Sequence, residues 1–155
     1  MQLSKTVTLA EATRNSLGVL NTPNKAQIDA LRELSVNVVD RVRERFKVLI
    51  TSMFRGPAVN AAAKGVATSQ HTLGEAVDLD GDNNDEVFFF IMENLNFDQL
   101  IAEDVDANGK PRWIHCSFRA RRNRKQVLIA VRRAGVMRYI PYTVADWNRI
   151  YAMKK

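Results

Sequence analysis

The sequence predicts an α+β domain with a mainly antiparallel sheet, and three observations support this. The chain has 155 residues, 46% of them hydrophobic, which is enough for one domain with a substantial core. An amphipathic helical pattern covers residues 24–47, and several short β-branched segments follow it. No repeat, low-complexity tract or Ser/Gly linker divides the chain, so residues 1–155 are expected to form a single domain.

The composition excludes several classes of protein. A single cysteine, Cys116, excludes a disulfide scaffold and any site that needs several thiolates. No apolar run approaches the length of a membrane span. The first sixteen residues, MQLSKTVTLAEATRNS, contain no apolar segment or cleavage pattern of a signal peptide. We therefore expect synthesis in a cytoplasm and a monomeric protein.

Charge is strongly segregated along the chain, whose net charge is +6. Residues 78–109 contain ten acidic residues and no Lys or Arg, whereas residues 112–138 contain nine basic residues and no acid. This pattern predicts an acidic region and a separate basic surface that suits an anionic partner.

The N-terminal third contains the longest predicted element. Residues 6–9 resemble a short β segment, and Thr22 followed by Pro23 is typical of an N-cap and a first helical residue. Apolar residues then recur every three to four positions over about six turns of helix. These residues are Ile28, Leu31, Leu34, Val38, Val42 and Phe46.

Shorter elements are expected in the rest of the chain. Asn83 and Glu86 form a capping-box pattern that opens a helix over VFFFIMENL, and Asn108-Gly109 lies in a hairpin connection. The expected strands are 47–53, 75–80, 97–103, 112–118, 126–132 and 137–142. A helical turn or short helix that ends near Gly65 is expected within 58–67, and a closing helix over 144–153.

Both histidines of the chain fall in segments with candidate metal ligands. His71 lies in a loop, Asp78 lies on the strand that follows, and Gly74 allows the turn between them. His115 shares the less apolar face of its strand with Trp113, which we expect to form a wall of the site. Two histidines and one carboxylate suit a catalytic zinc site, because three protein ligands leave one position open. By spacing alone, two isolated histidines with local partners are the commoner explanation.

The segment SQHTLGEAVD resembles the SxHxxGxAxD signature of the zinc D-Ala-D-Ala carboxypeptidase and L-alanyl-D-glutamate peptidase family, and WIH resembles its second ligand element. ITSMFRGPAVNAAAKGVATSQH and FDQLIAE are similar to further family segments in the same order, over residues 12–120. The resemblance implies the fold shared with the hedgehog signalling domain. It also implies hydrolysis of peptidoglycan stem peptides or cross-links. A small form without targeting signals resembles phage endolysins and virion-associated wall hydrolases, which act on the wall from the host cytoplasm or the virion.

Carried over residue by residue, the resemblance implies that His71, Asp78 and His115 bind Zn²⁺. It implies that Arg55 binds a substrate carboxylate or the developing oxyanion, a role that suits a fixed cation; a solvated arginine is the alternative. Ser69 would hydrogen-bond to the motif loop or to substrate, and a simple loop cap is the equal alternative.

The general base departs from the common family pattern. Many relatives carry an acid three residues before the second histidine, where this chain has Arg112, which cannot accept a proton. The nearby acids are Glu103, Asp104 and Asp106, and we choose Glu103 because it ends the FDQLIAE segment.

Hairpin register leaves this choice open. A two-residue turn at Asn108-Gly109 would pair Glu103 with Ile114, on the wrong face of the sheet. A shift by one residue would place Glu103 beside His115, and a longer connection permits that shift.

A basic run follows the second histidine and comprises Arg119, Arg121, Arg122, Arg124 and Lys125. No nucleic-acid-binding motif accompanies it, so we expect a solvated turn that suits an anionic cell envelope rather than specific nucleic acid. The alternative function is a non-catalytic domain of the same fold that binds envelope or nucleic acid through residues 119–138. The host and the peptidoglycan bond that is cut stay open: L-Ala-D-Glu, D-Ala to the cross-bridge, or the terminal D-Ala-D-Ala.

Overall fold

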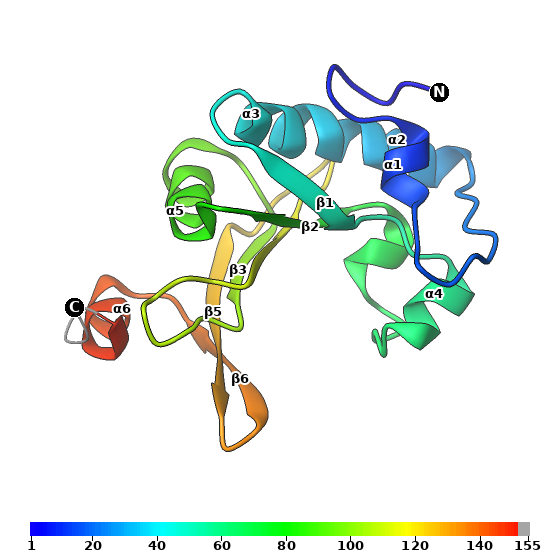
Figure 1. Ribbon diagram of the computed structural model, residues 1–155. Helices are drawn as coiled ribbons and strands as arrows, with labels where there is room; N and C mark the ends of the chain where they lie inside the picture. The colour runs from blue at the N-terminus through cyan, green and yellow to red at the C-terminus, as the bar shows by residue number, and fades with distance from the viewer. Residues whose placement is uncertain (152–155) are drawn as a thin grey trace.

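A six-stranded sheet forms the centre of the computed structural model, which describes residues 1–151 (Figure 1). The strand order is β1-β2-β4-β3-β5-β6, and within the described residues β3 and β5 are the one parallel pair. This arrangement confirms the α+β class. The strands are β1 (Val48–Ser52), β2 (Ala76–Gly81), β3 (Gln99–Glu103), β4 (Trp113–Ser117), β5 (Gln126–Arg133) and β6 (Val136–Pro141).

Helices connect and flank the strands. The α-helices are α1 (Leu9–Thr13), α2 (Lys25–Leu34), α3 (Asp40–Arg43), α4 (Pro57–Ala62), α5 (Asn84–Asn94) and α6 (Val144–Tyr151). A π-helical segment, η1 (Ser35–Val39), joins α2 to α3, and a short 3₁₀ helix, η2 (Gln70–Leu73), precedes β2. None of the helices within residues 1–151 is long and apolar enough to cross a membrane.

The predicted long helix is present as α2, η1 and α3 in succession, but it ends at Arg43 rather than at residue 47. Four residues of its apolar stripe are buried, and the two outermost, Ile28 and Phe46, are half-buried. Its predicted start at Thr22 is wrong, because Asn24 is the N-cap. The Asn24 side chain accepts from the Gln27 N–H at 2.9 Å, and the Gln27 side chain accepts from the Asn24 N–H at 2.7 Å. These two reciprocal bonds satisfy two backbone donors, so the helix begins after Asn24 rather than at Pro23.

The predicted start of α5 is correct in position, but the predicted capping box is absent. Asn83 is the N-cap, yet its side chain makes no capping hydrogen bond within the part of the chain described. Asn84 is the buried anchor instead, and its side-chain amide donates to the Pro111 carbonyl at 3.0 Å. Its side-chain oxygen also accepts from the Gly81 N–H at 2.9 Å, so Asn84 anchors this helix start in place of the expected Asn83–Glu86 pair.

The short terminal elements also differ from expectation. The predicted β segment at 6–9 is wrong: Thr8 forms one isolated bridge with Gln2, and its side chain caps α1. The predicted helix at 58–67 ends at Ala62. The predicted helix over 144–153 is present up to Tyr151, and residues 152–153 lie outside the described residues.

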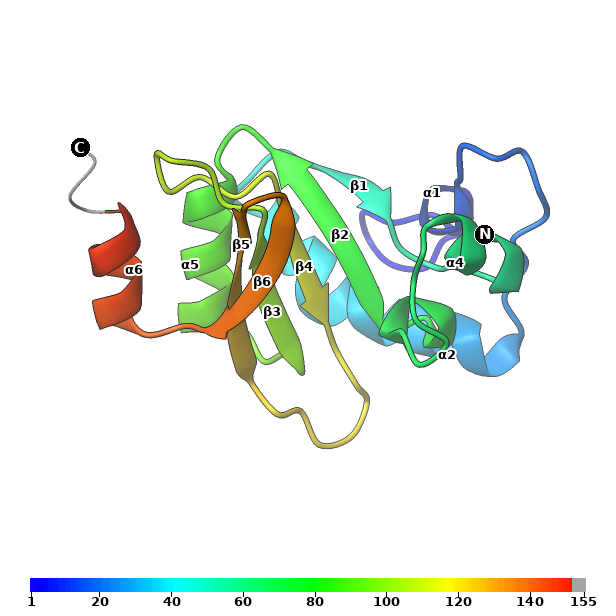
Figure 2. The same cartoon turned by 90° about the horizontal axis from the view of Figure 1, so that it is seen from below.

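The long helix and α5 cover one face of the sheet; in Figure 2 the long helix runs behind β2 and β4, and α5 lies beside β5. Buried side chains of the strands, including Leu79, Leu100, Ile114 and Cys116, form the core on this side. Cys116 thus packs as a small hydrophobe, as expected. Because side chains alternate along a strand, Asp78, Glu103 and His115 are left on the opposite face.

The C-terminal helix joins this core through aromatic packing. The Trp147 ring of α6 stacks on the Phe88 ring of α5, with ring centroids 5.7 Å apart. Tyr151 is buried next to Trp147. These contacts hold the β5–β6–α6 segment against the rest of the domain.

Candidate metal centre and active site

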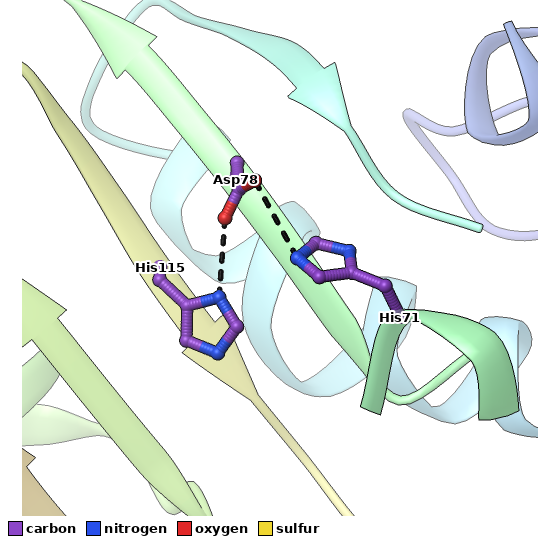
Figure 3. Close-up of side chains that lie close together, drawn as sticks. All are labelled: His71, Asp78 and His115. Atoms are coloured by element: carbon purple, nitrogen blue, oxygen red, sulfur yellow. Dashed lines mark hydrogen bonds and ion pairs between the residues drawn. The ribbon is translucent and has the colours of Figure 1, made fainter. Parts of the chain in front are cut away.

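His71, Asp78 and His115 meet on the open face of the sheet (Figure 3). They come from η2, β2 and β4, and Asp78 lies directly opposite His115 in the β2–β4 pair. His115 Nδ1 lies 3.1 Å from Asp78 Oδ1, and His71 Nε2 lies 3.4 Å from Asp78 Oδ2. One ligand atom from each residue lies within 4.8 Å of the others, so the three side chains could hold a single metal ion.

The protonation of His71 follows from its second contact. Its Nδ1 lies 2.7 Å from the Met53 carbonyl oxygen, which can only accept, so Nδ1 carries the ring proton. In the neutral ring the Nε2 lone pair then faces the Asp78 carboxylate. A ring proton or a metal ion between Nε2 and the carboxylate would satisfy both groups, and a backbone carbonyl on the outer nitrogen is typical of metal-ligating histidines.

The spacing of the ligand atoms suits zinc. Ligand atoms at about 2.0 Å from a tetrahedral ion lie about 3.3 Å from one another. His71 Nε2 lies 3.4 Å from Asp78 Oδ2 and His115 Nδ1 lies 3.1 Å from Asp78 Oδ1, so each imidazole approaches a different oxygen of the carboxylate at about this separation. The donor set of two imidazoles and one carboxylate is also one that zinc prefers, so the residues present fit this ion.

Asp78 is held in its ionised form. Burial alone would raise the pKa of Asp78, but hydrogen bonds and charge interactions with His115 and His71 lower it well below the ordinary range. A metal ligand must be deprotonated, and this carboxylate meets that condition.

Arg55 also contacts the central carboxylate. Its Nη2 lies 3.3 Å from Asp78 Oδ2, and its Nε donates to Ser52 Oγ at 3.0 Å. The Arg55 side chain is 16% exposed, which does not suit the solvated arginine considered from the sequence. The guanidinium is therefore a cation fixed at the edge of the site.

Asn21 positions the segment that carries Arg55, and the sequence analysis did not identify it. Its side-chain amide donates to the Phe54 carbonyl at 2.9 Å, and its oxygen accepts from the Gly56 N–H at 2.6 Å. The sequence shows only an Asn in a turn-rich stretch. That pattern is the same for a buried Asn that joins two segments and for an ordinary exposed turn residue.

The motif loop is shaped by Gly74 and Ser69. Gly74 has a φ of +77°, and a Cβ there would lie 2.7 Å from the Gln27 carbonyl oxygen, so the position requires glycine. Ser69 is the N-cap of η2, where its Oγ accepts from the His71 N–H at 3.3 Å. Ser69 therefore caps the motif loop, which is one of the two alternatives that the sequence left open. It also lines the cleft beside His115.

The β3–β4 register places Glu103 opposite Trp113, so both share the face of His115. This is the one-residue shift considered above, and the longer turn from Asp106 to Gly109 allows it. Trp113 is half-buried and lies two residues before His115 on the same face of β4.

Glu103 differs from the other two candidate bases in its environment. It is 8% exposed, and its Oε1 has no hydrogen-bond partner among residues 1–151. Burial raises the pKa of Glu103, and the negative charge of Asp78 raises it further against the opposing effect of His115.

The side chains of Asp104 and Asp106 are engaged elsewhere. Asp104 pairs with Arg112 at 3.3 Å and with Arg132 at 3.4 Å. Asp106 accepts two backbone N–H bonds within its own turn. Of the three acids, Glu103 is therefore the one that is buried on the face of His115 and has an oxygen without a partner among the described residues.

Tyr139 of β6 is a further residue near Glu103 that the sequence did not indicate. Burial, followed by the negative charge of Glu103, raises the pKa of Tyr139 to about 12. Residues 137–142 show only the pattern of a strand, and nothing in that pattern says which distant carboxylate the tyrosine reaches.

The fold and this site together define a metallopeptidase of the zinc-dependent kind. Residues 5–117, more than half of the chain, match the family model described as peptidase M15, and the chain belongs to this family. The match confirms the family expected from SQHTLGEAVD and WIH, and all three candidate ligands lie inside it. A search of curated proteins found no match.

Proposed function

We propose that this protein hydrolyses peptidoglycan stem peptides or cross-links, as an endolysin or virion-associated wall hydrolase, with residues 1–155 acting as one catalytic domain. Membership of the M15 family supports a peptide substrate. The motif resemblance and the basic surface, which suits an anionic envelope, favour the wall as its source.

The proposed metal ligands are His71, Asp78 and His115. The observation that carries this assignment is the approach of both imidazoles to one carboxylate, with His71 Nε2 3.4 Å from Asp78 Oδ2 and His115 Nδ1 3.1 Å from Asp78 Oδ1. Bound Zn²⁺ would lower the pKa of a water molecule and polarise the substrate carbonyl at the same time.

Glu103 is the proposed general base and acid. Its unpartnered, buried Oε1 is free to accept a proton from the attacking water. A carboxyl group with a raised pKa holds that proton more readily, so the same group can then donate it to the leaving amine.

Three further residues have proposed roles around the scissile bond. Arg55 keeps Asp78 in position and stabilises negative charge that develops on the substrate carbonyl oxygen. Trp113 provides an apolar wall against which the peptide packs, and Ser69 offers a hydroxyl at the edge of the cleft.

The proposal is tested by digestion of purified peptidoglycan with zinc-loaded protein, followed by mass analysis of the fragments. We expect new termini at one type of bond, which identifies the peptide bond that is cut. The metal-free protein and the Glu103→Gln variant serve as controls and should release no fragments at comparable rates. Intact peptidoglycan after incubation with zinc-loaded wild-type protein would contradict the proposal.

A further inference from the structure

A cleft of about 530 Å³ opens beside His115 and extends away from Glu103. Ser69 and Gln70 of the motif loop line one side. Arg119, Arg121 and Arg124, from the loop that follows β4, line the same cleft. The basic run expected to be a solvated turn therefore borders the candidate active site.

Hydrogen bonds hold the backbone of this basic loop in place. Asn123 accepts from the Arg119 N–H at 2.9 Å, and its amide donates to the Arg119 carbonyl at 3.0 Å. The Phe118 N–H donates to the Glu75 carbonyl at 2.8 Å, which ties the start of the loop to the start of β2. These bonds give the arginines a defined position beside the cleft.

The acidic groups of the cleft leave one arginine available. Asp98 is fully buried and pairs with Arg124 at 2.8 Å and with Arg119 at 3.8 Å. The Glu75 carboxylate accepts from Gln70 at 3.3 Å. Arg121 is exposed, and no carboxylate in the described range 1–151 lies within 4.0 Å of its guanidinium.

We propose that Arg121, supported by Arg119, binds a carboxylate of the peptide substrate in this cleft. This inference rests on the proposed function and adds a determinant of specificity to it. A guanidinium binds a carboxylate through two parallel hydrogen bonds, which gives direction as well as affinity. Arg121 lies in the loop that follows β4, and His115 of β4 lines the same cleft. The bound carboxylate therefore belongs to a part of the peptide close to the bond that is cut.

Two carboxylates of a stem peptide have this chemistry: the free carboxylate of its D-Glu residue and its C-terminal carboxylate. The test uses a synthetic stem pentapeptide in three forms: unmodified, amidated at D-Glu, and amidated at the C-terminus. Binding is measured by calorimetry in the zinc-loaded Glu103→Gln protein, and cleavage is measured in the zinc-loaded protein that retains Glu103. Both measurements are repeated with proteins that also carry Arg121→Gln or Arg122→Gln. Arg122→Gln is the matched control, because Arg122 lies in the same loop but does not line the cleft.

We expect Arg121→Gln to weaken binding of the unmodified peptide about tenfold and to raise its KM with little change in kcat. One amidated peptide should bind equally weakly with and without Arg121, and that peptide identifies the carboxylate. Arg122→Gln should leave all three affinities unchanged.

An equal effect of Arg121→Gln on all three peptides, no effect on any, or no binding of any peptide would overturn the inference. Cleavage without discrimination among the peptides supports the proposed function and rejects this carboxylate site. Discrimination in binding without cleavage by wild-type protein supports the carboxylate site and rejects the proposed function.

Discussion

Asp78 and His115 occupy directly opposite positions in the antiparallel β2–β4 pair, with Asp78 Oδ1 3.1 Å from His115 Nδ1. Because side chains alternate along strands, this register places both groups on the open face and their neighbours Val77 and Cys116 in the core. A shift of one residue would bury one of the polar groups and separate the pair. The sheet that builds the core therefore also determines the geometry of the candidate metal centre.

The first prediction concerns the metal. Replacing His71, Asp78 or His115 by Ala should abolish zinc retention and peptidase activity together, because each removes one of three proposed ligands. Elemental analysis of the purified variants measures the metal, and chelation of the wild-type protein should lower its melting temperature. About one zinc per chain in every variant would show that the ligands lie elsewhere.

The second prediction concerns the general base. Glu103→Gln keeps the shape of the side chain but removes its proton-accepting charge, so turnover should fall by a factor on the order of 10²–10⁴ with zinc content unchanged. Asp104→Asn and Asp106→Asn are the matched controls, and both should have mild effects. Normal turnover in Glu103→Gln with a large loss in either control would move the base to the connection between β3 and β4.

The third prediction concerns Tyr139 and pH. The Tyr139 hydroxyl near Glu103 lowers the pKa of this carboxyl group, because it stabilises the charged carboxylate. Tyr139→Phe should therefore raise the pKa of Glu103. A base with a higher pKa becomes protonated at higher pH, so the acidic limb of the kcat/KM profile should move to higher pH. An unchanged limb, measured at constant zinc content, would mean that Tyr139 has no influence on the base.

The fourth prediction concerns Gly74. Gly74→Ala should destabilise the fold by about 2 kcal/mol or more, because it combines a positive φ with a clash against the Gln27 carbonyl. Gly135→Ala is the control: its φ is +79°, but no atom among the described residues lies within 4 Å of a Cβ there. Gly135→Ala should lower the free energy of unfolding by only about 1 kcal/mol, because only the positive φ opposes the alanine there. Chemical denaturation measures both, and equal losses would mean that the close approach to α2 has no energetic consequence.

The fifth prediction concerns the buried Asp98. Burial would raise the pKa of Asp98, but its hydrogen bonds with Arg124 lower it overall. A carboxyl group with a lowered folded-state pKa contributes stability above its unfolded pKa and loses it as pH falls through the folded value. Asp98→Asn should thus cost about 1–3 kcal/mol at pH 7. The difference from wild type should shrink below about pH 4.

Thermal unfolding from pH 3 to pH 7 measures this difference. The exposed Asp82→Asn removes the same charge in another loop and should have little effect at any pH. A pH-independent cost of Asp98→Asn would show that the carboxylate charge does not contribute.

Several features were predictable because they depend on local sequence. The long helix shows in the apolar repeat from Ile28 to Phe46, and each strand of the sheet shows in a short apolar or β-branched run. The candidate ligands were found because His71, Gly74 and Asp78 lie close together in one motif and the second histidine of the chain lies in WIH. For these features the residues that decide the outcome lie near one another in the chain.

Other features depended on contacts between distant segments, so only the tertiary structure decided them. The register that puts Glu103 opposite Trp113 follows from how β3 and β4 pack on the core, since either register satisfies the local pattern. Tyr139 reaches the site because β5 pairs in parallel with β3 and brings β6 alongside. The basic loop borders the cleft because Asp98, more than twenty residues earlier in the chain, binds Arg124. Residue type and spacing determined which chemical groups this protein has, whereas long-range packing determined which of them meet.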